Sequence, residues 1–141
     1  VAAGLVEVAR ERTPSFIGHG RIDWRSGDML DPSLGTFAHV VAMDSLIHYQ
    51  PADLADALSQ LAERTTHSIL FTFAPRTALL QTMYTIGKAF PRSDRSPAIV
   101  PTLEWEIRHR LAQLPGWRIG RTKRISSGFY TSQALELVRQ G

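Results

Sequence analysis

The order of strand-like and helix-like segments constrains the fold of this chain more than any other feature. Residues 36–46, TFAHVVAMDSL, form a continuous apolar run with β-branched Val40 and Val41, which is typical of a buried strand. A proline at position 51 suits the first turn of a helix. Apolar side chains then recur at helical spacing: Leu54, Leu58, Leu61 and Ala62. Residues 67–75, HSILFTFAP, predict the next strand. This alternation favours an α/β fold with a parallel sheet.

The two ends of the chain extend this pattern. Leu5, Val8 and Ala9 predict a helix at the start, and the RIDW stretch at 21–24 predicts a strand after it. A further helix is predicted from Thr102, with a core face of four apolar residues: Leu103, Ile107, Leu111 and Leu114. The last two segments, RIGRTKRIS and SQALELVRQ, predict strands joined by a short connection. Such a close pair indicates an antiparallel hairpin at an edge of the sheet.

Composition narrows the function classes. The 141 residues suffice for one domain, which we expect to span 1–141. The absence of cysteine excludes disulfides, thiolate metal ligands and a cysteine nucleophile. The net charge of +3 suits an anionic small molecule or an anionic membrane surface, and is small for a nucleic-acid binder. The histidines outside the junction described next do not pair at ligand spacing, so no protein metal site is predicted.

Polar residues gather where the first long strand gives way to the helix. Five side chains mark this junction: Met43, Asp44, Ser45, His48 and Tyr49. In open α/β sheets, ligands bind beyond the carboxyl ends of the strands. The junction is therefore predicted to form one wall of a ligand site. Alternatively, His48 is a helix-entry residue satisfied by the backbone, and Tyr49 is a packing residue with an exposed hydroxyl.

Three stretches carry a resemblance to a known family. They are GDML at 27–30, MDSLIHYQPADLADAL at 43–58 and GKAFPRSDRSPAIVP at 87–101. Together they resemble the magnesium-protoporphyrin IX O-methyltransferases, which are class I S-adenosylmethionine-dependent methyltransferases. The resemblance covers essentially the whole chain. It implies a Rossmann-like sheet whose last strand is inserted antiparallel through a C-terminal hairpin.

One part of the family pattern has no counterpart here. The glycine-rich strand-loop-helix and the acidic residue that closes the second strand are absent, so the resemblance implies the C-terminal two-thirds of the domain without strands 1 and 2. The HVVAM strand is then expected to have a bare apolar edge, which is an aggregation hazard. We expect the isolated chain to fold poorly, to bind no cofactor and to be inactive.

The resemblance also implies roles for individual residues. Asp28 would accept from the adenine amine of S-adenosylmethionine and Met29 would cover the ring, whereas an ordinary Asx turn is the alternative for Asp28. Met43, Asp44 and Ser45 would lie beside the sulfonium. His48, with Tyr49, would orient the acceptor carboxylate or touch the macrocycle or its metal.

Residues 76–101 resemble a lid-like insertion on the acceptor side. Leu79, Met83, Ile86 and Phe90 would supply an apolar wall for a porphyrin. One of three arginines, Arg76, Arg92 or Arg95, would pair with a propionate. The alternative is that the stripe packs on the sheet and the arginines are solvated.

The implied reaction is methyl transfer from S-adenosylmethionine to a propionate carboxylate of magnesium-protoporphyrin IX, in (bacterio)chlorophyll biosynthesis. The alternatives are a related small-molecule methyltransferase with another acceptor, or a non-enzymatic basic α/β binding fragment. The family implies a cytoplasmic protein, peripheral at the photosynthetic membrane, that receives its substrate from the large subunit of magnesium chelatase. Four basic residues near the C-terminus either block edge pairing or contact anionic lipid or an acidic partner: Arg118, Arg121, Lys123 and Arg124.

Overall fold

The computed structural model describes residues 3–14, 20–76, 99–127 and 130–141. The chain divides into two compact units, Val1–Leu34 and Gly35–Gly141, and each is described by itself. The first unit contains the helix α1 (Ala3–Glu11) and the 3₁₀ helix η1 (Pro32–Leu34). Thr13 closes α1, because its Oγ1 donates to the Ala9 carbonyl at 2.8 Å. The helix predicted at the start of the chain is thus confirmed.

The strand predicted at 21–24 does not form. Residues 20–27 have no strand pairing in the structure. A strand exists only through its hydrogen bonds to a neighbour. The segment that contains Ile22 and Trp24 has no partner strand among the described residues, and the Ile22 side chain is exposed.

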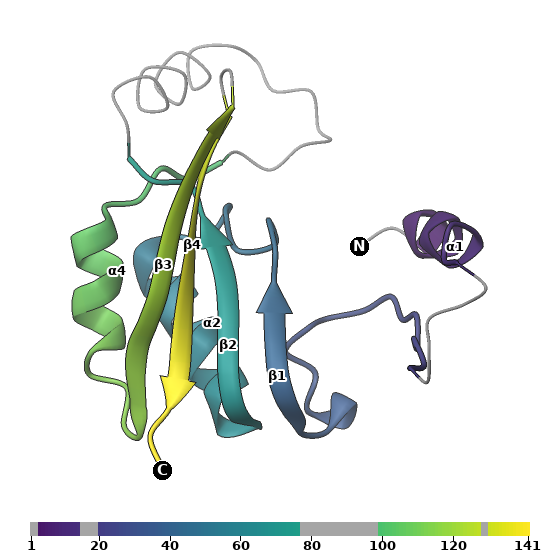
Figure 1. Cartoon of the computed structure of the whole chain (residues 1–141), viewed down its shortest axis with the longest axis horizontal. Helices are drawn as coiled ribbons and strands as arrows, with labels where there is room; N and C mark the ends of the chain where they lie inside the picture. The colour runs from purple at the N-terminus through teal and green to yellow at the C-terminus, as the bar shows by residue number, and fades with distance from the viewer. Residues whose placement is uncertain (1–2, 15–19, 77–98, 128–129) are drawn as a thin grey trace. The chain divides into compact units, whose positions relative to one another are not determined.

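The second unit is built on a four-stranded mixed sheet (Figure 1). Its strands are β1 (Phe37–Ala42), β2 (Thr65–Phe73), β3 (Trp117–Ser127) and β4 (Tyr130–Arg139), in the order β1-β2-β4-β3. β1 and β2 are parallel, whereas β4 is antiparallel to both β2 and β3. The last strand is therefore inserted antiparallel beside β2, and the predicted C-terminal hairpin places β3 at the edge.

Two helices form the core with one face of this sheet. α2 (Pro51–Glu63) packs on β2, and α4 (Glu104–Leu111) packs on α2 and β3. Figure 1 shows α2 behind the sheet and α4 beside β3. The predicted apolar stripe of α2 is buried: Leu54, Leu58, Leu61 and Ala62. Facing side chains from the sheet complete the core: Ile69, Phe71, Phe73, Leu135 and Leu137.

No helix among the described residues has the length and apolar character of a membrane span.

The prediction that residues 36–46 form a buried strand was wrong in two respects. β1 ends at Ala42, and most of its residues are exposed. Val41 is 61% exposed. β1 is an edge strand, and the helices described above cover one face of the sheet, so an apolar run does not by itself guarantee burial. The expected bare apolar edge on this strand is present within the described part of the chain.

Candidate functional site

The junction between β1 and α2 forms a rim at the carboxyl end of the parallel strands. It begins after Ala42 and ends before Pro51, the first residue of α2. Leu46 is fully buried and anchors the junction, and the Tyr49 amide donates to the Leu46 carbonyl at 3.1 Å in a turn. The side chains of Met43, Asp44 and Ser45 are exposed, whereas His48 and Tyr49 are half-buried. This part of the chain therefore presents sulfur, carboxylate, hydroxyl, imidazole and phenol groups along one short path.

Asp44 has an unusual backbone conformation. Its φ of 52° is left-handed, and among the described residues no other non-glycine has a positive φ. This conformation costs roughly 1 kcal/mol for an L-residue, less for Asp than for most others. Its amide donates to Oγ1 of Thr72 at 2.8 Å, and the same hydroxyl donates to Asp44 Oδ1 at 3.1 Å. These two bonds offset the cost and fix the path of the chain as it leaves β1.

Thr72 is a functional candidate that the sequence analysis missed. It lies between Phe71 and Phe73 in an apolar strand. A polar residue in such a strand is the sequence signal that could have identified it as a candidate. A threonine near the carboxyl end of the second parallel strand is placed to reach the chain that leaves the first.

The two ends of the predicted insertion meet beside this junction. The Arg76 amide donates to the Thr102 carbonyl and the Thr102 amide donates to the Ala74 carbonyl, both at 2.8 Å. The Val100 amide donates to the Ile47 carbonyl at 2.8 Å. Arg76 is thus tied to Thr102, and Val100 is tied to Ile47, the residue before His48. The apolar and basic side chains predicted within the insertion lie outside the described residues: Leu79, Met83, Ile86, Phe90, Arg92 and Arg95.

Asp28 and Met29 belong to the first unit. Asp28 Oδ1 accepts from the Leu30 amide at 2.9 Å, which is the Asx turn that was the alternative for this residue. The Asp31 amide donates to the Asp28 carbonyl at 3.2 Å and leads into η1. The turn does not test the predicted adenine contact, which stays a prediction.

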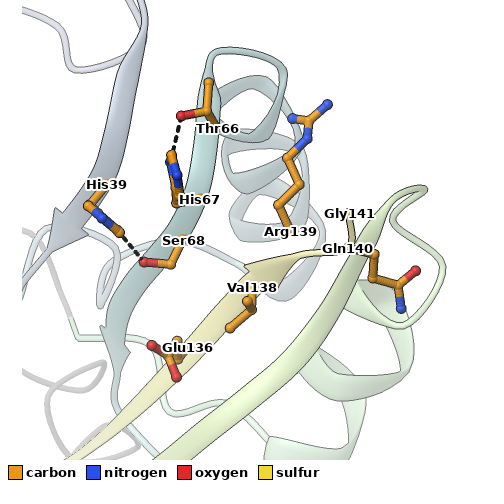
Figure 2. Close-up of a pocket in the computed structure, with 9 residues that line it drawn as sticks. All are labelled: His39, Thr66, His67, Ser68, Glu136, Val138, Arg139, Gln140 and Gly141. Atoms are coloured by element: carbon orange, nitrogen blue, oxygen red, sulfur yellow. Dashed lines mark hydrogen bonds between the residues drawn. The ribbon is translucent and has the colours of Figure 1, made fainter.

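A separate hollow of about 580 Å³ opens at the amino ends of β1 and β2, at the other end of these strands from the rim (Figure 2). His39 pairs with Ser68 on β2, next to His67, and the ring centroids of the two histidines are 5.3 Å apart. Their Nδ1 atoms are engaged by Ser68 Oγ and Thr66 Oγ1, each at 2.8 Å. No sequence pattern marks this pair, because the two histidines lie far apart in the sequence and meet only through strand pairing. Two imidazoles are too few for a metal site, and the described residues include no group of three metal-ligating side chains.

Two residues of the basic run on β3, Arg121 and Arg124, form ion pairs with glutamates. Arg121 donates to both carboxylate oxygens of Glu136 at 2.9 Å, and its amide donates to Oε2 at 3.2 Å. These bonds, together with the charges of Arg121 and Arg118, lower the pKa of Glu136 from 4.5 to about 2. Arg124 donates to Glu104 at 3.3 Å. These pairs on an edge strand favour the role of charge in blocking edge pairing.

Comparison with known proteins places these features in a family. The family model for the magnesium-protoporphyrin IX methyltransferase C-terminus matches residues 42–139, which include the whole junction and Thr72. Magnesium-protoporphyrin O-methyltransferase of Rhodobacter capsulatus is 40% identical over 136 residues, 96% of this chain and 58% of that protein. The enzyme of that name from Synechocystis is 33% identical over 139 residues, 99% of this chain and 60% of that protein. The chain thus spans about three-fifths of the length of these two relatives.

Solved structures agree with the fold. A crystal structure of magnesium protoporphyrin IX methyltransferase from Synechocystis PCC 6803 with bound SAH has a TM-score of 0.61 and 33% identity, and the match covers 75% of this chain and 46% of that one. A structure of the same protein with bound SAM has a TM-score of 0.74, 23% identity and coverage of 99% and 57%. The Rossmann-like methyltransferase sheet with its C-terminal antiparallel hairpin is confirmed. The chain belongs to the magnesium-protoporphyrin IX methyltransferase family.

Proposed function

We propose that the protein transfers a methyl group from S-adenosylmethionine to a propionate carboxylate of magnesium-protoporphyrin IX and forms its monomethyl ester. The observation that carries this proposal is the family match, because it runs through the junction from Met43 to Tyr49. The relative that is 40% identical has the name of this activity. The step belongs to (bacterio)chlorophyll biosynthesis.

The proposed reaction does not require a strong general base. A carboxylate is already ionised at neutral pH, since its ordinary pKa is near 4. Its oxygen attacks the methyl carbon, the carbon–sulfur bond breaks, and the electron pair stays on sulfur. The products are the methyl ester and S-adenosylhomocysteine, and no proton is taken up or released at the carboxylate. Positioning and desolvation therefore dominate the rate enhancement.

The residues of the rim are proposed to position the methyl donor and the acceptor carboxylate. Three exposed side chains at the end of β1 would line the donor: Met43, Asp44 and Ser45. From the family resemblance alone, Asp28 and Met29 would contact its adenine. His48 would orient the propionate, with Tyr49 beside it. Both residues are half-buried, and a half-buried imidazole is shielded from water and still reachable by a ligand.

The partners and location are proposed from the family resemblance alone. The protein would work in the cytoplasm, peripheral at the photosynthetic membrane. It would receive magnesium-protoporphyrin IX from the large subunit of magnesium chelatase. The porphyrin wall and propionate anchors would come from residues 76–101.

The direct test uses the full-length protein with methyl-labelled S-adenosylmethionine and either magnesium-protoporphyrin IX or metal-free protoporphyrin IX. We expect a single ester whose mass exceeds that of the substrate acid by one CH2 unit, with the magnesium porphyrin preferred. Alkaline hydrolysis should release the label as methanol. A protein that binds the donor but labels no porphyrin would favour a related methyltransferase with another acceptor. A steep fall of RNA affinity with salt, without donor binding, would favour a binding module.

A further inference from the structure

The strongest unexplained feature of the rim is the side-chain bridge that joins the ends of β1 and β2. The ladder between these strands ends at the pair Ala42–Phe71. One residue further on β2, Thr72 takes over from the backbone and binds both the amide and the carboxylate of Asp44. A side chain thus continues the connection where the backbone pairing stops.

Thr72 is itself held firmly. It is 6% exposed, and it pairs with Ala134 in the ladder between β2 and β4. Its neighbours Phe71 and Phe73 are 0% and 1% exposed and belong to the core between the sheet and the helices. Because side chains alternate along a strand, Thr72 faces the other side of the sheet. A nearly buried hydroxyl on a central strand is a rigid reference point for the exposed junction.

We propose that Thr72 is a positioning residue for the methyl donor. By holding Asp44 in its left-handed conformation, Thr72 sets the direction in which Met43 and Ser45 leave β1 at the rim. This inference rests on the proposed function, because it takes the segment 43–45 as part of the donor site. Thr72 does not touch the reacting atoms and acts through Asp44.

The bridge has a defined chemistry. The threonine hydroxyl has one proton to donate and lone pairs to accept. It gives the proton to Asp44 Oδ1 and accepts from the Asp44 amide, so both of its roles are used by one residue. Valine has the shape of threonine without the hydroxyl and removes both bonds, whereas serine keeps them. The pair of substitutions therefore separates the hydroxyl from the packing.

A matched control lies on the same strand. Thr65 is 1% exposed, and its Oγ1 donates to the Leu61 carbonyl at 2.7 Å, at the opposite end of β2 from the rim. Thr65→Val removes a buried threonine hydroxyl bond without touching the junction. It reports the general cost of such a change.

The experiment measures S-adenosylhomocysteine binding to the full-length protein by calorimetry, with thermal unfolding of each variant in parallel. We expect Thr72→Val to weaken binding about tenfold, Thr72→Ser to stay within about threefold of wild type, and Thr65→Val to lower Tm without changing Kd. In steady-state kinetics, Thr72→Val should raise KM for the donor and leave KM for the porphyrin unchanged.

Two results would overturn the assignment. One is wild-type affinity in Thr72→Val. The other is an equal loss of affinity in Thr72→Val and Thr65→Val, which would mean that stability alone is responsible. If the wild-type protein bound no S-adenosylhomocysteine, the proposed function would fail, and the role of Thr72 with it. Hydrogen exchange gives a readout without ligand: the Asp44 amide should lose protection in Thr72→Val and keep it in Thr72→Ser.

Discussion

The hairpin between β3 and β4 contains a bulge whose geometry makes a sharp prediction for Gly120→Ala. Ile119 pairs with Leu137 and Thr122 with Leu135, so two residues of β3 lie opposite Glu136. A Cβ at position 120 would lie 2.8 Å from Glu136 Oε2 and 3.0 Å from Val138 Cγ2. The first distance is shorter than real Cβ contacts and the second is tight, so the carboxylate must move away.

The expected loss of stability depends on the hydrogen bonds that the movement of the Glu136 carboxylate breaks. The carboxylate accepts two bonds from the Arg121 guanidinium and one from the Arg121 amide, the donor left unpaired by the bulge. The Arg121 side chain is 90% exposed, so water replaces much of the lost interaction, whereas the Glu136 side chain is 15% exposed. Together these considerations give a loss of about 1 kcal/mol in the free energy of unfolding.

The lowered pKa of Glu136 determines how the stability difference between Gly120→Ala and wild type changes with pH. Glu136 has a pKa of about 2 in the folded protein, compared with 4.5 in the unfolded chain. A lowered folded pKa contributes stability that is complete above pH 4.5 and is lost as the pH falls toward 2. Since Gly120→Ala removes the bonds that lower this pKa, the variant should lose stability relative to wild type at neutral pH, and this difference should shrink on acidification below pH 4.5.

The assay is urea unfolding of the full-length protein, followed by tryptophan fluorescence between pH 7 and pH 3, with Trp117 as a buried probe. Glu136→Gln supplies the control, because Gly120→Ala should cost less in that background. The reasoning is refuted if Gly120→Ala is as stable as wild type at pH 7, or if the difference grows as the pH falls.

The other predictions concern the rim and the chain as a whole. His48→Ala should lower kcat/KM for the porphyrin roughly 10- to 100-fold and leave donor affinity intact, as measured by ester formation; a parallel loss of donor affinity would contradict its assignment to the acceptor. Leu46→Ala should cost about 3 kcal/mol in urea unfolding because Leu46 is 0% exposed, whereas Met43→Ala, at a side chain that is 64% exposed, should change stability little. The isolated 141-residue chain should show a broad thermal transition and no calorimetric signal with S-adenosylhomocysteine, and a cooperative melt would count against the expected incompleteness of its fold.

Much of the fold follows from local patterns. The stripe of Leu54, Leu58 and Leu61 after Pro51 is sufficient to define α2, because helical periodicity and a proline at the first turn agree. The close pair of strands at the C-terminus predicts the hairpin. The position of β4 beside β2 was predicted from the family resemblance. The residues of β4 alone do not indicate which strand pairs with it besides β3.

The features that escaped prediction depend on tertiary pairing. The exposure of Val41 depends on which strands and helices surround β1, and an apolar run alone does not report that. The left-handed Asp44 is stabilised by Thr72, 28 residues away, and no local motif links the two. His39 and His67 meet because the parallel pairing of β1 and β2 sets His39 opposite Ser68, the neighbour of His67. The position of Asp44 at a strand end was enough to predict that it lies in a ligand site, whereas its partner Thr72 could not be predicted. The place of Asp44 beside the methyl donor came from the family resemblance and stays a prediction.

The central claim is that the methyl donor meets the protein at the junction between β1 and α2. The most direct measurement is the change in backbone amide NMR shifts of the full-length protein on addition of S-adenosylhomocysteine. The largest changes are expected in residues 43–49, with His39 and His67 unaffected. Changes that cluster around these two histidines, with residues 43–49 unmoved, would contradict the claim.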